Sequence, residues 1–170
     1  MKFTICGLLI ACLPVFEAAA ADAVNIAVSG KIVASPCIFN GGNDAVNVNL
    51  GDIQAKNMAT PGSLSTPVPF TLSFTQCPEG TRSVTTTFTG TTDPVAGGDY
   101  YKNSGSAENI ALGIIETRTG NIKGSGQSIT QAVAADRTLS MAMQAVTYSQ
   151  AGGVTPGTIA VAVAVTLQYN

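Results

Sequence analysis

The chain has 170 residues, of which 10 are acidic and 8 basic, giving a formal net charge of −2, and it contains no histidine. The few basic residues are scattered, so the sequence offers no basic stripe for nucleic acid and no basic amphipathic helix for a membrane surface. Without histidine, a Ser–His catalytic pair is excluded and a zinc site is disfavoured. The abundance of Thr, Val, Ala and Gly predicts an all-β domain with short strands and many turns.

Residues 1–20 have the pattern of a secretory signal peptide. Lys2 supplies the positive start, Phe3–Val15 the apolar centre and Ala18–Ala21 a small-residue cleavage site. A membrane anchor is the alternative, but the apolar stretch is too short and is interrupted by Pro14 and Glu17. Cleavage after Ala20 or Ala21 leaves about 150 residues, which suits one domain.

A first strand is predicted at the start of the exported chain. One face of this strand carries Val24, Ile26, Val28, Gly30 and Ile32, and the other face carries small or polar residues.

Cysteine usage points to a disulfide. Cys6 and Cys12 lie in the segment expected to be removed, which leaves Cys37 and Cys77. We expect an exported chain with two widely spaced cysteines to join them.

The interior shows strand-like alternation at near-regular spacing, with turn residues in between. Strands are expected over residues 45–50, 67–76, 82–89, 110–114 and 139–148. A short helical turn is expected near residues 52–58, and a loop over residues 93–101. This order of elements is typical of a β-sandwich.

A strand over residues 158–169 is the strongest signal in the chain. Its large residues are all at odd positions, from Ile159 to Tyr169, so one face is bulky. Neither a turn nor a partner strand follows it, and such an edge aggregates unless another part of the chain or another protein covers it.

Candidate catalytic groups are weak. Asp93, Asp99, Glu108 and Glu116 are conceivable as a glycosidase pair, but acids in loops and turns are normally just solvated. Tyr100-Tyr101 is conceivable as a sugar-stacking pair, and an edge cap for the sandwich is the favoured interpretation. Gly124-Ser-Gly126 lacks the strand–turn–helix context of a phosphate loop. We therefore predict no catalytic residues, no metal site and no cofactor.

Taken together, several segments resemble the chaperone–usher pilin family, and within it the small adaptor subunits of the type 1 pilus tip fibrillum. The matching residues are Val24–Cys37, Val48–Asp52, Thr75–Thr81, Tyr100–Ile110, Gly157 and Tyr169. Gly157 and the penultimate tyrosine match the family's chaperone-recognition motif.

The resemblance implies an incomplete immunoglobulin-like sandwich that lacks its seventh strand and is completed by donor-strand complementation. Residues 1–20 would be the signal peptide, 21–34 the N-terminal donor extension leading into the first strand, and 35–170 the pilin domain. The donor residues would be the alternating set from Val24 to Ile32. The groove and chaperone-binding strand would comprise Gly157, Ile159, Val161, Val163, Val165, Leu167, Tyr169 and Asn170.

The implied function is that of a structural subunit of an adhesive pilus, a tip adaptor that links the adhesin to the rod. A major rod subunit and a carbohydrate-binding adhesin module are the alternatives. The implied partners are a periplasmic chaperone, an outer-membrane usher and neighbouring pilus subunits including a tip adhesin, with no nucleic acid and no small-molecule substrate. The chain would pass through the periplasm to the cell-surface pilus.

Overall fold

The computed structural model describes residues 27–31 and 36–170. The chain divides into two units, residues 1–32 and 33–170, and every described strand lies in the second. Short 3-10 helices occur at η1 (Asn40–Gly42) and η2 (Ala55–Met58), and the described residues contain no α-helix. The expected helical turn near residues 52–58 is therefore confirmed as η2.

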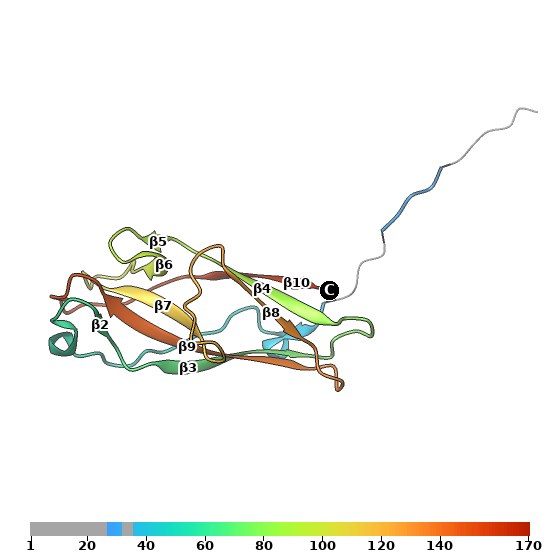
Figure 1. Ribbon diagram of the computed structural model, residues 1–170, viewed down its shortest axis with the longest axis horizontal. Coiled ribbons are helices and arrows are strands. Elements are labelled where there is room, and N and C mark those ends of the chain that lie inside the picture. The colour runs from blue at the N-terminus through green and yellow to red at the C-terminus, as the bar shows by residue number, and fades with distance from the viewer. Residues whose placement is uncertain (1–26, 32–35) are drawn as a thin grey trace, which may run out of the picture. The chain divides into compact units, whose positions relative to one another are not determined.

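The second unit consists of two antiparallel sheets that face one another (Figure 1). The larger sheet has the order β1-β3-β9-β7-β6-β5, and β2 pairs with β9 outside this path. Its strands are β1 (Ile38–Phe39), β2 (Ser63–Leu64), β3 (Val68–Thr75), β5 (Thr92–Asp93), β6 (Gly97–Lys102), β7 (Ala111–Glu116) and β9 (Leu139–Ser149). The smaller sheet has the order β10-β4-β8, with β4 (Ser83–Thr89), β8 (Ser128–Ala132) and β10 (Ala164–Tyr169).

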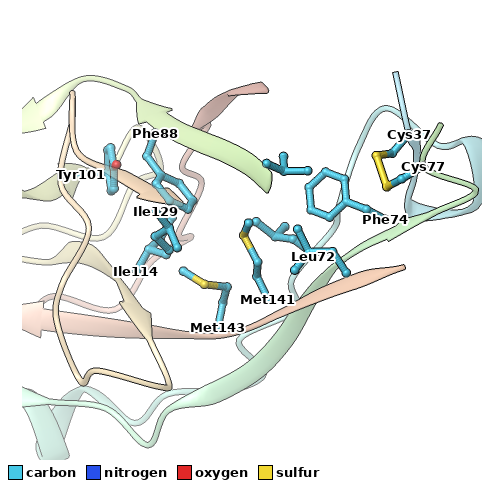
Figure 2. Close-up of a cluster of buried hydrophobic side chains, with 12 residues drawn as sticks. Cys37, Leu72, Phe74, Cys77, Phe88, Tyr101, Ile114, Ile129, Met141 and Met143 are labelled. Atoms are coloured by element: carbon cyan, nitrogen blue, oxygen red, sulfur yellow. A yellow bond between two sulfur atoms is a disulfide. The ribbon is translucent and has the colours of Figure 1, made fainter. Parts of the chain in front are cut away.

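Alternation along the strands builds the core between the sheets. β9 buries Leu139, Met141, Met143 and Ala145 while the residues between them face outward. Figure 2 shows this cluster receiving side chains from both sheets, Phe88 among them. The expected strands over residues 67–76, 82–89, 110–114 and 139–148 are confirmed as β3, β4, β7 and β9.

The expected disulfide between Cys37 and Cys77 is present. Figure 2 shows it at one end of the cluster, next to Phe74. Both cysteines are buried and are separated by 40 residues in sequence. Closing a loop of this length stabilises the fold by about 4 kcal/mol in the chain-entropy model.

Several sequence predictions about elements are wrong. Residues 93–101 contain most of the β5–β6 hairpin rather than a loop, and β8 was not predicted. Residues 45–50 form no strand; their exposure still alternates, but among the described residues no strand pairs with them. Likewise only residues 164–169 of the expected strand over 158–169 are β-strand, because β4 ends at Thr89, opposite Ala164.

The prediction that Tyr101 caps the edge of the sandwich is also wrong. The side chain is fully buried, and its hydroxyl donates a hydrogen bond to the Lys123 carbonyl at 2.9 Å. Tyr100 lies on the opposite side of β6, where its ring stacks on Tyr148 with centroids 4.4 Å apart. The two tyrosines therefore form no joint platform for a sugar.

Candidate functional site: a groove beside β10

A groove of about 1400 Å³ opens between two extended segments of the second unit. Residues 44–53 form one side of the groove, and residues 157–169 form the other. We call residues 157–169 the groove segment. Core side chains from both sheets line the groove as well: Phe70, Leu72, Phe88, Leu112, Ile114 and Ala145. The groove is therefore an opening into the hydrophobic core.

Side chains of the groove segment alternate as the sequence predicts. All the residues at odd positions line the groove: Gly157, Ile159, Val161, Val163, Val165, Leu167 and Tyr169. The even positions Thr158, Ala162 and Ala164 also contribute to its lining. Most of them are half-buried, whereas the intervening residues are exposed. Val165 exposes 36% of its surface, unusually much for a valine in the middle of a strand. Large apolar side chains thus point into an opening that the described residues leave unfilled around Val165.

The backbone of the groove segment follows the same odd–even rule. Asn170 donates its N–H to the Ser83 carbonyl at 2.9 Å, and the Ser83 N–H returns a bond at 3.1 Å. In an antiparallel ladder every second residue bonds to the same neighbour. With this register, Gln168, Thr166 and Ala164 direct their backbone groups to β4.

The backbone N–H and C=O groups of Val165, Leu167 and Tyr169 therefore point away from β4, toward the groove. Among the described residues, no strand pairs with this edge of β10. The same residues offer apolar side chains and backbone groups that no described strand pairs with, which is the combination that an added β-strand satisfies.

Upstream of β10, a loop replaces β4 as the neighbour of the groove segment. Ser104 donates its N–H to the Ala160 carbonyl at 2.9 Å, and Ala107 donates to the Thr158 carbonyl at 3.0 Å. Sequence reasoning missed this loop. The only available signal was the cluster Asn103-Ser-Gly-Ser106, which is typical of turns but does not reveal a partner about 50 residues away.

Gly157 lies at the point of closest approach to this loop. A Cβ placed on Gly157 would lie 2.4 Å from the Ala107 nitrogen and 2.7 Å from the Ser106 carbonyl carbon. Gly157 has an ordinary φ, so the glycine is required by space and not by backbone conformation. The close contact explains by packing why residue 157 is a glycine. The sequence resemblance associates the same glycine with chaperone recognition.

The described part of the proposed donor segment is exposed. Val28 exposes 90% of its surface, and residues 27–31 form no strand. The predicted donor residues Val24, Ile26 and Ile32 lie outside the described residues.

Of the candidate carboxylates, Glu116 is not a solvated acid. Its side chain is 6% exposed and forms ion pairs with Arg118 at 2.9 Å and Lys123 at 3.2 Å. Burial alone raises the pKa of Glu116, but hydrogen bonds from Thr119, Lys123 and Arg118 and the Lys123 charge outweigh it and lower the pKa. A carboxylate held ionised between two cations is a structural ion pair, unsuited to serve as a general acid.

The described residues contain no group of three or more His, Cys, Asp or Glu side chains placed to hold a metal ion. They also contain no helix long and apolar enough to cross a membrane.

Comparison with known proteins identifies similar chains. The family described as Fimbrial protein matches residues 26–170. Protein FimG of Escherichia coli K12 is 35% identical over 152 residues, which cover 89% of this chain and 87% of FimG. The uncharacterized fimbrial-like protein YdeR of the same strain is 42% identical over 120 residues, or 71% of this chain, and the match spans 65% of YdeR's length.

A solved structure shows the same fold. The P pilus rod subunit PapA superposes with a TM-score of 0.66 at 17% sequence identity, over 80% of this chain and all of PapA. The all-β architecture of the second unit is thus that of the immunoglobulin-like pilus subunits.

Proposed function

Because the chain belongs to the fimbrial protein family, we propose that its groove is completed by a β-strand from another protein during pilus assembly. A periplasmic chaperone supplies the strand first, and the N-terminal extension of a neighbouring subunit then replaces it. One observation carries this proposal: residues Val165, Leu167 and Tyr169 present to the same open groove both apolar side chains and backbone groups with which no described strand pairs.

The chain's own extension serves as the donor for the next subunit. Residues 1–20 are removed on export, residues 21–34 form the extension and residues 35–170 form the pilin domain. Burial of Val24, Ile26, Val28 and Ile32 in a neighbour's groove contributes roughly 6–12 kcal/mol before ordering costs. Gly30 interrupts this apolar row and lets the two backbones approach closely.

Within the pilus, the chain acts as a tip adaptor between the adhesin and the rod. The resemblance of segment Tyr100–Ile110 to tip adaptors supports this position. The likeness to PapA supports the fold alone, because the two chains are only 17% identical. The chain has no catalytic role, and its partners are the chaperone, the outer-membrane usher and neighbouring subunits at the cell surface.

Thermal melting tests the open groove. The mature protein is released from its chaperone and melted with and without a synthetic peptide that copies residues 22–33, which stands in for the extension of a neighbouring subunit. We expect the peptide to raise the melting temperature strongly, since it binds the folded form only. The proposal would be contradicted if the lone chain is already very stable and melts at the same temperature with and without the peptide.

Deletion of residues 22–33 tests the direction of donation. The shortened subunit should still co-purify with its chaperone but should no longer complete a neighbouring subunit in a strand-exchange assay. Loss of chaperone binding would show that the extension belongs to the subunit's own core.

Copy number tests the position in the pilus. Quantitative mass spectrometry of sheared fibres should find a few copies per fibre. A copy number in the thousands would identify a rod subunit instead.

A further inference from the structure

The groove extends beyond the point where β4 supports the groove segment. Pairing with β4 runs from Tyr169, opposite Val84, to Ala164, opposite Thr89, and stops there. The groove continues along residues 157–163. Another part of the chain must therefore hold this end of the groove in an extended conformation.

The loop formed by residues 103–108, here the Asn103 loop, holds it. Besides its two backbone bonds to Ala160 and Thr158, the loop exchanges side-chain bonds with the segment. The Thr158 N–H donates to Ser106 Oγ at 2.9 Å, and the Ser106 N–H donates to Thr158 Oγ1 at 3.0 Å. These bonds connect parts of the chain that lie 52 residues apart in sequence.

Asn103 is the centre of this contact. Its Nδ2 donates to the Thr158 carbonyl at 3.2 Å, and its Oδ1 accepts the Ala160 N–H at 2.8 Å. The same amide shapes the loop, because Nδ2 also donates to the Ala107 carbonyl at 2.8 Å and Oδ1 accepts the Gly105 N–H at 3.0 Å. The half-buried side chain thus uses both donors and both lone pairs of its oxygen.

The bonds to Thr158 and Ala160 bracket Ile159. They take up the C=O before Ile159 and the N–H after it, the groups that a neighbouring strand would otherwise satisfy. Successive residues of an extended chain direct their side chains to opposite faces and their backbone groups to opposite edges. Anchoring both neighbours therefore orients Ile159, whose side chain lines the groove.

We infer that Asn103 is a positioning residue for the added strand, and that it sets the Ile159 end of the groove without touching the strand itself. This inference rests on the proposed donor-strand function. Replacement of Asn103 by alanine frees residues 157–163 from a large part of their anchoring, while residues 164–169 remain paired with β4. The affinity for an added strand should fall about tenfold, as expected for loss of one or two hydrogen bonds.

Binding measurements with end-modified peptides test the inference. The peptide of residues 22–33 is titrated into the mature full-length protein, its Asn103→Ala variant and a control variant. The control is Asn121→Ala, which removes an exposed amide on another turn. Two further peptides carry Val24→Ala or Ile32→Ala. In double-mutant cycles, we expect Asn103→Ala to show a coupling energy with only one of the two peptide substitutions. Equal coupling with both ends, or with neither, would overturn the inference.

Hydrogen exchange gives an independent readout. In Asn103→Ala, the hydrogen-bonded amides of Thr158 and Ala160 should exchange about tenfold faster, while the amides of Ala164, Thr166 and Gln168, which pair with β4, keep their protection. Equal acceleration in both segments would overturn the inference. Ser106→Ala removes the Oγ that accepts the Thr158 N–H and bonds to Thr158 Oγ1. It should give the same pattern with a smaller amplitude if Asn103→Ala does not fold.

The two proposals fail differently. A wild-type protein that binds none of the peptides contradicts the strand-accepting groove, whereas local hydrogen exchange still decides whether Asn103 orders residues 157–163. A wild-type protein that binds, together with an Asn103→Ala variant that binds equally well, contradicts the role of Asn103 alone.

Discussion

Gly157 and Ala107 approach so closely that a single methyl group on Gly157 would lie 2.4 Å from the Ala107 nitrogen. The obstacle is backbone, so a longer side chain at residue 157 cannot be accommodated by a rotamer change. The contact links the start of the groove segment to the Asn103 loop.

Gly157→Ala should accordingly displace the start of the groove segment. We expect a loss of about 1–3 kcal/mol in the free energy of unfolding, the usual cost of overpacking. Gly98→Ala is the matched control, since a Cβ there meets nothing within 4 Å. Denaturant unfolding of both variants measures the difference, and equal stabilities would show that the segment moves freely away from the loop.

Val165→Asp should impair strand binding more than folding. Val165 is partly open in the lone chain, so a carboxylate there is still solvated, but an added strand would bury it without a partner. We expect peptide affinity to fall more than a hundredfold, or about 3 kcal/mol. Gln168→Asp is the control, because Gln168 faces outward. If Gln168→Asp proves the more damaging change, the assigned faces of β10 are wrong.

Tyr101→Phe should cost about 1 kcal/mol at neutral pH, because it leaves the Lys123 carbonyl without its donor. Tyr148→Phe, at a half-buried hydroxyl near the surface, should cost less.

The cost of Tyr101→Phe should also depend on alkaline pH. Burial raises the pKa of Tyr101 to about 12, above the usual value of 10.0. The folded state therefore holds the proton more tightly than the unfolded state, and this contribution to stability is fully present below pH 10 and lost between pH 10 and 12. Denaturant unfolding across this range should show the difference between wild type and Tyr101→Phe shrinking as pH rises. A constant difference would contradict the pKa assignment.

Glu116→Gln should destabilise the protein by about 3 kcal/mol at pH 7, because Lys123 would lose its buried counter-charge. Since the folded-state pKa of Glu116 lies below the usual value of 4.5, its contribution is present above that pH and is lost as pH falls through the folded-state pKa. The wild-type advantage should therefore shrink in acid. Glu108→Gln, at an exposed position, is the control and should leave stability unchanged at both pH values.

The sequence by itself determined the elements in which one face is buried along the whole strand. The alternation of Leu139, Met141 and Met143 predicts β9 and its inward face, because a period of two has only one way to place three large side chains in a core. Exposure follows the same period along the groove segment, where most odd positions are half-buried and the even positions are exposed. The disulfide followed from an export signal and two remaining cysteines.

Tertiary structure alone decided the elements whose residues carry little apolar pattern. β8 buries a single large apolar side chain, Ile129, and the β5–β6 hairpin is rich in glycine and polar residues, so neither has a period to detect. Glu116 is a buried, paired carboxylate and not a solvated acid, because Lys123 folds back beside it. The groove likewise depends on residues 44–53 and 157–169 meeting across the fold, and its Ile159 end depends on Asn103, 55 residues away from Thr158 in sequence. Such contacts arise from the path of the whole chain, which no local pattern encodes.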